Sequence, residues 1–154
     1  MKRGDIVLIK NRFDIVGWFI RRLLWIKYNH VGWAINSKQI IECRSTGIYI
    51  NHIKKYQNFC YKIKVLRIQD INKEKLDLAL RYASVIQKKY EYLSSIKTYI
   101  RILFNDPIHR FTCSGFIAYF LSEQGFYFNK NKHPLYITPR DIEKCKYLEE
   151  VNNE

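Results

Sequence analysis

The sequence predicts an α+β fold, in which an antiparallel sheet packs against helices. Segments with β-type patterns cluster in the first half of the chain, and helical patterns lie mostly in the second half, which is typical of this class. Of the 154 residues, 47% are hydrophobic and 16% are aromatic, a composition that favours a packed core over disorder. The length predicts a single domain that spans residues 1–154.

Five strands are expected. "GDIVLIK" at residues 4–10 has the pattern of a short buried strand after a glycine turn. "HVGWAI" and "QIIEC", at 30–35 and 39–43, are separated by "NSK" and predict a hairpin. "GIYI" at 47–50 predicts another short strand, and "YKIKVLRI" at 61–68 alternates as a longer one.

Helices are expected in five places. Residues 14–28 carry an apolar helical face with Asp14 as a cap, and residues 72–90 give the clearest amphipathic pattern. Residues 94–104 form a further helical pattern before "NDP", and residues 114–126 another that stops at Gly125. "TPRDIEKC" at 138–145 has the pattern of a turn into a short helical piece.

The chain is strongly basic, with 27 Lys and Arg against 14 Asp and Glu and a formal charge of +13. Such a charge favours polyanions or an anionic surface, although basic residues spread through every segment also serve as a solubilising face. We predict no specific nucleic-acid partner. No signal peptide or membrane span is visible, so a cytoplasmic location is expected. The segment around Trp18 and Trp25 either packs on the domain or lies on a membrane surface.

The cysteines stand at 43, 60, 113 and 145, without CxxC or zinc-finger spacing, so no metal site and no cofactor is predicted. Without a secretory signal the thiols are expected to be reduced. Cys113 begins the helical stretch in "RFTCSGFIAYFL". Unpaired N–H groups at a helix start favour a thiolate, so this cysteine is either core filler or a nucleophile.

His30 is the best candidate for a base beside Cys113. Strand alternation places His30 on one sheet face with Gly32 and Ala34, whose small side chains leave room for the ring. An odd-length hairpin turn puts Glu42 on that face, whereas a two-residue turn would put it on the opposite one. Trp33 then faces away from His30.

The chain has three other histidines. His52 and His133 lie in polar contexts typical of solvated loops, and His109 is a rival base four residues before Cys113.

Several motifs of the chain occur in an order that resembles a known family. "GDIVLI", "NHVGWAI", "IIEC...GI", "KKYEYLS", "RFTCSGFIAYFL" and "TPRD" follow one another from Gly4 to about Asp141. The chain thereby resembles the permuted papain-like cysteine hydrolases of the NlpC-like superfamily, in particular the YaeF/YiiX type. The resemblance implies a circularly permuted papain-like fold, in which a sheet or small barrel packs against helices and the cysteine starts a helix.

The resemblance also implies roles. Cys113 would be the nucleophile, His30 the general base, and Glu42 the residue that orients the ring. Tyr90 stands where the family has a tyrosine near the active site, but Lys89 and Glu91 replace the family's flanking Pro and Asp, and Tyr92 competes for the place. Gly115 stands where the permuted group often has an acidic residue.

The expected function is a cysteine hydrolase that cleaves an amide bond, in a peptide or amino-acid linkage of cell-wall type, through a thioester. One alternative is a lipid-directed acyl hydrolase or acyltransferase at an anionic membrane surface. Another is a non-enzymatic module that binds polyanions. The expected partner is therefore a small amide- or ester-containing substrate, with peripheral contact to an anionic surface or polymer left open.

Overall fold

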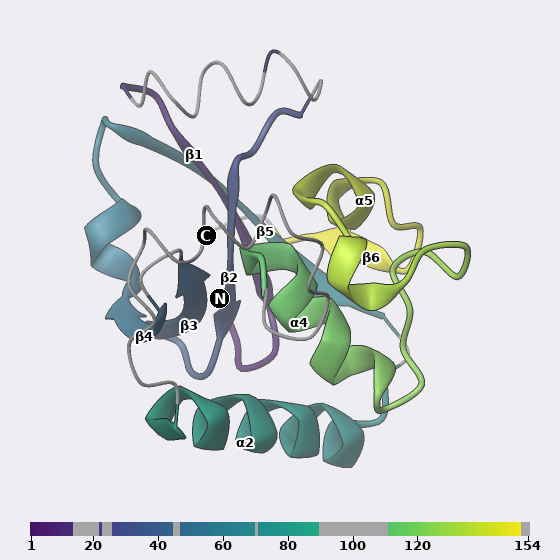
Figure 1. Ribbon diagram of the computed structural model, residues 1–154. Helices are drawn as coiled ribbons and strands as arrows, with labels where there is room; N and C mark the ends of the chain where they lie inside the picture. The colour runs from purple at the N-terminus through teal and green to yellow at the C-terminus, as the bar shows by residue number, and fades with distance from the viewer. Residues whose placement is uncertain (14–21, 23–25, 45–46, 70, 90–110, 152–154) are drawn as a thin grey trace, which may run out of the picture.

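The computed structural model describes residues 1–13, 22, 26–44, 47–69, 71–89 and 111–151 (Figure 1). Six antiparallel strands form one open sheet in the order β4-β3-β2-β1-β5-β6. The strands are β1 (Ile6–Asn11), β2 (His30–Ala34), β3 (Gln39–Arg44), β4 (Gly47–His52), β5 (Tyr61–Ile68) and β6 (Leu148–Glu150). The described helices are α2 (Lys73–Lys89), α4 (Cys113–Ser122) and α5 (Pro139–Glu143), with the 3-10 turns η1 (Ile53–Tyr56) and η3 (Pro134–Tyr136).

The predicted α+β class with an antiparallel sheet is confirmed, and the sheet is open. All five expected strands are present, because each carries the alternation or apolar run of a strand with at least one buried face. The sixth strand, β6, was not predicted, since its three residues have no pattern of their own and pair with the end of β5.

Some of the expected helices are present, and others lie outside the described residues. The helix expected at 72–90 is present as α2, and that at 138–145 as the shorter α5. The helix expected at 94–104 lies outside the described residues, as do Asp14 and most of the 14–28 segment, in which the described Arg22 is helical and residues 26–28 are not.

The helix expected at 114–126 begins one residue earlier, at Cys113, and ends at Ser122. It ends early because Gly125 has a φ of 83° and closes a turn, in which the Phe126 N–H donates to the Leu121 carbonyl at 3.0 Å.

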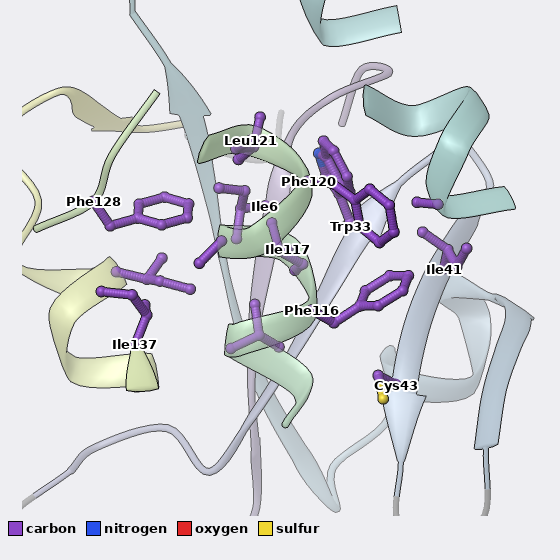
Figure 2. Close-up of a cluster of buried hydrophobic side chains, with 14 of the residues drawn as sticks. Ile6, Trp33, Ile41, Cys43, Phe116, Ile117, Phe120, Leu121, Phe128 and Ile137 are labelled. Carbon is purple, nitrogen blue, oxygen red and sulfur yellow. The ribbon is translucent and has the colours of Figure 1, made fainter. Parts of the chain in front are cut away.

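The main core lies between the sheet and α4. Figure 1 shows α4 in front of the strands and α2 below them. Figure 2 shows Phe116, Ile117 and Phe120 of α4 directed toward the strand residues Trp33 and Ile41. As expected from strand alternation, Trp33 faces away from His30, and it is fully buried in this cluster.

The opposite face of the sheet carries a smaller core. Its members come from β1, β2, β3 and η1: Val7, Ile9, Ala34, Ile40, Ile53 and Tyr56. Because η1 covers this face, the tyrosine at its end comes to lie over the strands that carry His30 and Glu42. In the described part of the chain, none of the helices has the length and apolar character needed to cross a bilayer.

Gly115 allows η3 to approach the first turn of α4. A Cβ on Gly115 would lie 2.7 Å from the carbonyl oxygen of Leu135 and 2.9 Å from Oγ1 of Thr112. The contact with Leu135 is a backbone contact, so the neighbour cannot move without shifting the chain. Ser114 adds a second tie, since its hydroxyl donates to the Ile137 carbonyl at 2.6 Å.

We therefore expect Gly115→Ala to destabilise the protein by about 1–3 kcal/mol, the usual cost of forcing an extra group into a packed site. Urea unfolding measures this change. Glu123→Ala, at the exposed far end of α4, serves as the control and should change stability by less than about 0.5 kcal/mol. Equal stabilities for the two variants would contradict the close approach.

Candidate active site

Cys113 is the first residue of α4. Thr112 caps the helix with extended backbone angles (φ −73°, ψ 164°), and its hydroxyl accepts a hydrogen bond from the Gly115 N–H at 3.0 Å. The thiol of Cys113 is half-buried and belongs to the first turn, where N–H groups have no partner within the helix. This end of the helix favours a negative charge on the sulfur.

The hairpin turn has the odd length that brings His30 and Glu42 to one face. The Ile35 N–H donates to the Gln39 carbonyl at 3.0 Å, and Asn36 Oδ1 accepts from the amides of Lys38 and Gln39, both at 2.8 Å. This register continues through the pairs Trp33–Ile41 and Ala34–Ile40, so Glu42 stands across from Gly32. Nε2 of His30 and Oε2 of Glu42 lie 2.5 Å apart.

The strands β2 and β3 part next to the site. Their ladder, along two fully described strands, consists of the pairs Trp33–Ile41 and Ala34–Ile40 and does not continue toward His30. If the ladder continued in the same register, the Val31 N–H would donate to the Cys43 carbonyl. The reason is that the odd-numbered residues of β2 direct their backbone hydrogen bonds toward β3. Instead, the Val31 N–H is a hydrogen-bond donor to the Cys113 sulfur.

The segment that leads into α4 lies against β3 beside this gap. The Cys43 thiol donates to the Phe111 carbonyl at 3.2 Å. The start of α4 therefore approaches the sheet where two neighbouring strands separate, and the Cys113 sulfur takes the place of a backbone acceptor.

The pKa shifts of Cys113 and His30 favour an ion pair between the two side chains. Burial opposes charge on both groups, but they are hydrogen-bond partners and each stabilises the charged form of the other. The pKa of the Cys113 thiol is lowered against this burial by His30 and by the N–H groups of Val31 and Ser114. The pKa of His30 is raised, also against burial, to about 9 by Cys113 and Glu42. Because Nε2 of the ring is bonded to Glu42, the nitrogen left for the thiol is Nδ1.

Glu42 is fully buried and is held by donors from three further side chains. Asn51 Nδ2 donates to Oε1 at 2.5 Å, and the Tyr56 hydroxyl lies 2.7 and 2.8 Å from the two carboxylate oxygens. Arg44 Nε lies 3.2 Å from Oε1, and Arg44 also donates to the Tyr56 hydroxyl. Against the effect of burial, His30, Tyr56 and Arg44 lower the pKa of Glu42 to about 2, so the carboxylate is charged beside the imidazolium.

The remaining cysteines have different surroundings. All four cysteines are free thiols. Burial, together with the nearby charge of Cys113, raises the pKa of Cys43 to about 12, and burial raises that of Cys145. Within the described residues no group of three or more His, Cys, Asp or Glu side chains is placed to hold a metal ion.

The structure thus brings together Cys113, His30 and Glu42, and their catalytic roles remain predictions. Tyr90, its competitor Tyr92 and the rival base His109 lie outside the described residues. His52 and His133 cap the turns η1 and η3 through their Nδ1 atoms.

Three residues that support Glu42 were not predicted from the sequence, namely Arg44, Asn51 and Tyr56. Alternation along β3 could have placed Arg44 on the face of Glu42. Asn51 depends on the register between β3 and β4, and Tyr56 on the path of η1, neither of which has a local signal in the sequence.

In comparisons with known proteins, the chain matches no protein-family model and no curated protein. Its function is therefore inferred from the residues of the site.

The ion pair predicts how the thiols react with iodoacetamide. Since His30 and the N–H groups of Val31 and Ser114 lower the pKa of Cys113, its alkylation rate should level off at a lower pH than that of an ordinary thiol, which gains about tenfold per pH unit below its own pKa. Above about pH 9, His30 loses its proton and the pair no longer exists. Peptide mass spectrometry measures the rate at each cysteine.

His30→Ala should return Cys113 to the steep profile of an ordinary thiol. Cys43 serves as the internal control and should stay unreactive, because it is buried and has a raised pKa. A steep profile for Cys113 in the unchanged protein would contradict the ion pair.

The buried carboxylate predicts a pH-dependent stability. The folded-state pKa of Glu42 is lowered from 4.5 to about 2, so its charge stabilises the fold above about pH 4.5, and this contribution is lost as the pH falls through about 2. The difference in free energy of unfolding between wild type and Glu42→Gln should therefore shrink over this interval. Urea unfolding at several pH values measures it.

Glu123→Gln, at an exposed carboxylate, should show a flat and small difference over the same interval. A difference for Glu42→Gln that does not vary with pH would show that the carboxylate is not stabilised in the folded state.

Proposed function

We propose that the protein is a cysteine hydrolase that cleaves an amide bond through a thioester on Cys113. One observation supports this most strongly: a half-buried thiol at a helix start shares a hydrogen bond with an imidazole whose other nitrogen is held by a buried carboxylate. This is the arrangement of nucleophile, base and orienting group that activates cysteine.

Binding of a polyanion does not require a cluster of ionised side chains such as Cys113, His30 and Glu42. A fully buried carboxylate is costly to desolvate, even with good partners, and a charged histidine and thiolate beside it add to that cost. Strongly shifted ionisable groups gathered at one place favour a functional site. The cluster therefore favours an enzyme over a polyanion-binding protein.

In the first half of the reaction, the Cys113 thiolate attacks the carbonyl carbon of the amide. The C–S bond forms, and the carbonyl π electrons move to oxygen. When the tetrahedral intermediate collapses, the C–N bond breaks and the leaving nitrogen takes the proton from Nδ1 of His30. The products are a free amine, a thioester on Cys113 and a neutral imidazole.

In the second half, neutral His30 removes a proton from water as the oxygen attacks the thioester carbonyl. The C–S bond breaks, a carboxylic acid leaves, and the thiolate–imidazolium pair is restored. Glu42 keeps the ring in one orientation through both halves, because its bond to Nε2 fixes which nitrogen faces the sulfur.

The developing oxyanion needs N–H donors. The backbone N–H of Cys113 is suited to this, since it belongs to the first turn of α4 and has no acceptor within the helix. One such donor contributes about 3 kcal/mol to transition-state stabilisation. Tyr90 is the second donor that the family resemblance implies.

The order of the elements supports a permuted papain-like fold as the finer description. The histidine strand β2 precedes the cysteine helix α4 in the chain, and α4 packs on an antiparallel sheet. The same resemblance suggests peptide or amino-acid amides of cell-wall type as substrates.

The test is hydrolysis of a panel of aminoacyl and peptidyl p-nitroanilides. Cys113→Ala should lower the rate by several orders of magnitude, because it removes the nucleophile. Cys60→Ala, which removes a half-buried free thiol outside the site, should leave the rate unchanged. Mass spectrometry of the quenched reaction should show an acyl group on Cys113.

Turnover of these amides by Cys113→Ala at the wild-type rate would refute the proposal. So would the absence of any acyl-enzyme and of any Cys113-dependent turnover across the panel.

A further inference from the structure

Two phenylalanines project from one end of the sheet. Phe13 and Phe59 are 67% and 76% exposed, and their rings meet edge to face with centroids 5.9 Å apart. Figure 1 shows this end of β1 and β5 at the top of the molecule, away from α2. Exposed apolar side chains are ordinary when scattered singly, but two in contact at the ends of neighbouring strands form a small apolar tip.

The backbone at this tip is fixed by hydrogen bonds. The last strand pair is Asn11–Tyr61, and beyond it the Arg12 N–H donates to the Cys60 carbonyl at 2.8 Å. Asn11 Oδ1 accepts from the Phe13 N–H at 3.1 Å, and Asn58 Oδ1 accepts from the Cys60 N–H at 2.9 Å. The two rings are therefore presented on an ordered support.

Exposed or half-buried basic side chains lie on the chain segments next to the apolar tip. They are Lys10, Arg12, Lys54, Lys55 and Lys62, and all but the half-buried Lys10 are exposed. Neither residues 6–13 nor residues 53–64 contain an Asp or Glu. An apolar projection carried by segments rich in basic residues matches the surface of an anionic membrane, where acyl chains receive the rings and lipid phosphates attract the lysines.

The tip also lies near the candidate active site. Ile9 of β1 pairs with His30, and β1 ends two residues further along the chain at Asn11, just before the bend that carries Phe13. A membrane bound at the tip would therefore lie at the same end of the sheet as His30, the first residue of β2.

We propose that the Phe13–Phe59 tip binds the surface of anionic membranes, with the two aromatic rings entering the interface and the neighbouring basic side chains contacting lipid headgroups. This binding does not depend on the proposed hydrolase activity. It would place the site beside substrates that are attached to, or partition into, the membrane.

Co-sedimentation with lipid vesicles tests this proposal. The protein should bind vesicles of phosphatidylcholine with about one third phosphatidylglycerol, and bind pure phosphatidylcholine much more weakly. Phe13→Ser together with Phe59→Ser should weaken binding to the anionic vesicles by about tenfold or more, through lost burial of two rings. Lys10→Glu together with Lys62→Glu should weaken it as well.

The matched control is Leu78→Ser together with Tyr82→Ser, which removes two exposed apolar side chains from α2 and should leave binding unchanged. Thermal unfolding of each variant shows whether it is folded. The Cys113→Ala variant should bind as wild type, which separates this proposal from the hydrolase proposal.

Three results would overturn the proposal. The first is the absence of binding to anionic vesicles, and the second is an equal loss of vesicle binding in the Phe13/Phe59 and Leu78/Tyr82 variants. The third is binding to a DNA duplex in place of vesicles, with an affinity that the phenylalanine substitutions do not change. The last result would assign the basic residues to a nucleic acid instead.

Discussion

The separation of β2 from β3 is the constraint on which the candidate site depends. If the two strands stayed paired, the Val31 N–H would donate a hydrogen bond to the Cys43 carbonyl. The start of α4 would then find no free backbone N–H beside the Cys113 sulfur. With the strands apart, the Cys113 sulfur receives the Val31 N–H and meets the His30 ring at the end of the same strand. A free backbone donor inside a fold is costly, and an ionised sulfur is an acceptor that satisfies it.

The charge on the sulfur is in turn maintained from the other face of the sheet. His30 stays protonated because Cys113 and Glu42 both raise its pKa, and Glu42 stays ionised although buried because Asn51, Tyr56 and Arg44 also bond to it. The donors come from β3, β4 and η1, so several elements must be in place before the histidine is held. The site therefore depends on β2, β3, β4 and η1 as well as on the helix that carries Cys113.

The sequence could predict the parts of this site that follow local rules. Strand alternation and the odd-length "NSK" turn place His30 and Glu42 on one face, and the pattern after Thr112 places Cys113 at a helix start. It could not predict the parting of β2 and β3, because both strands have an unbroken β pattern through Val31 and Cys43. Tyr56 was missed for a similar reason, since its contact with Glu42 depends on how η1 folds back over the sheet. The short strand β6 depends on pairing with β5 in the same way.

An NMR titration of the His30 imidazole measures the central claim, the ion pair, most directly. In the wild-type protein the ring nitrogens should keep the shifts of an imidazolium up to about pH 9. In Cys113→Ala the pKa should fall, because the negative sulfur that holds the second proton is gone while burial still opposes the charge. A ring that titrates near its usual pKa of about 6.5 in both proteins would contradict the ion pair.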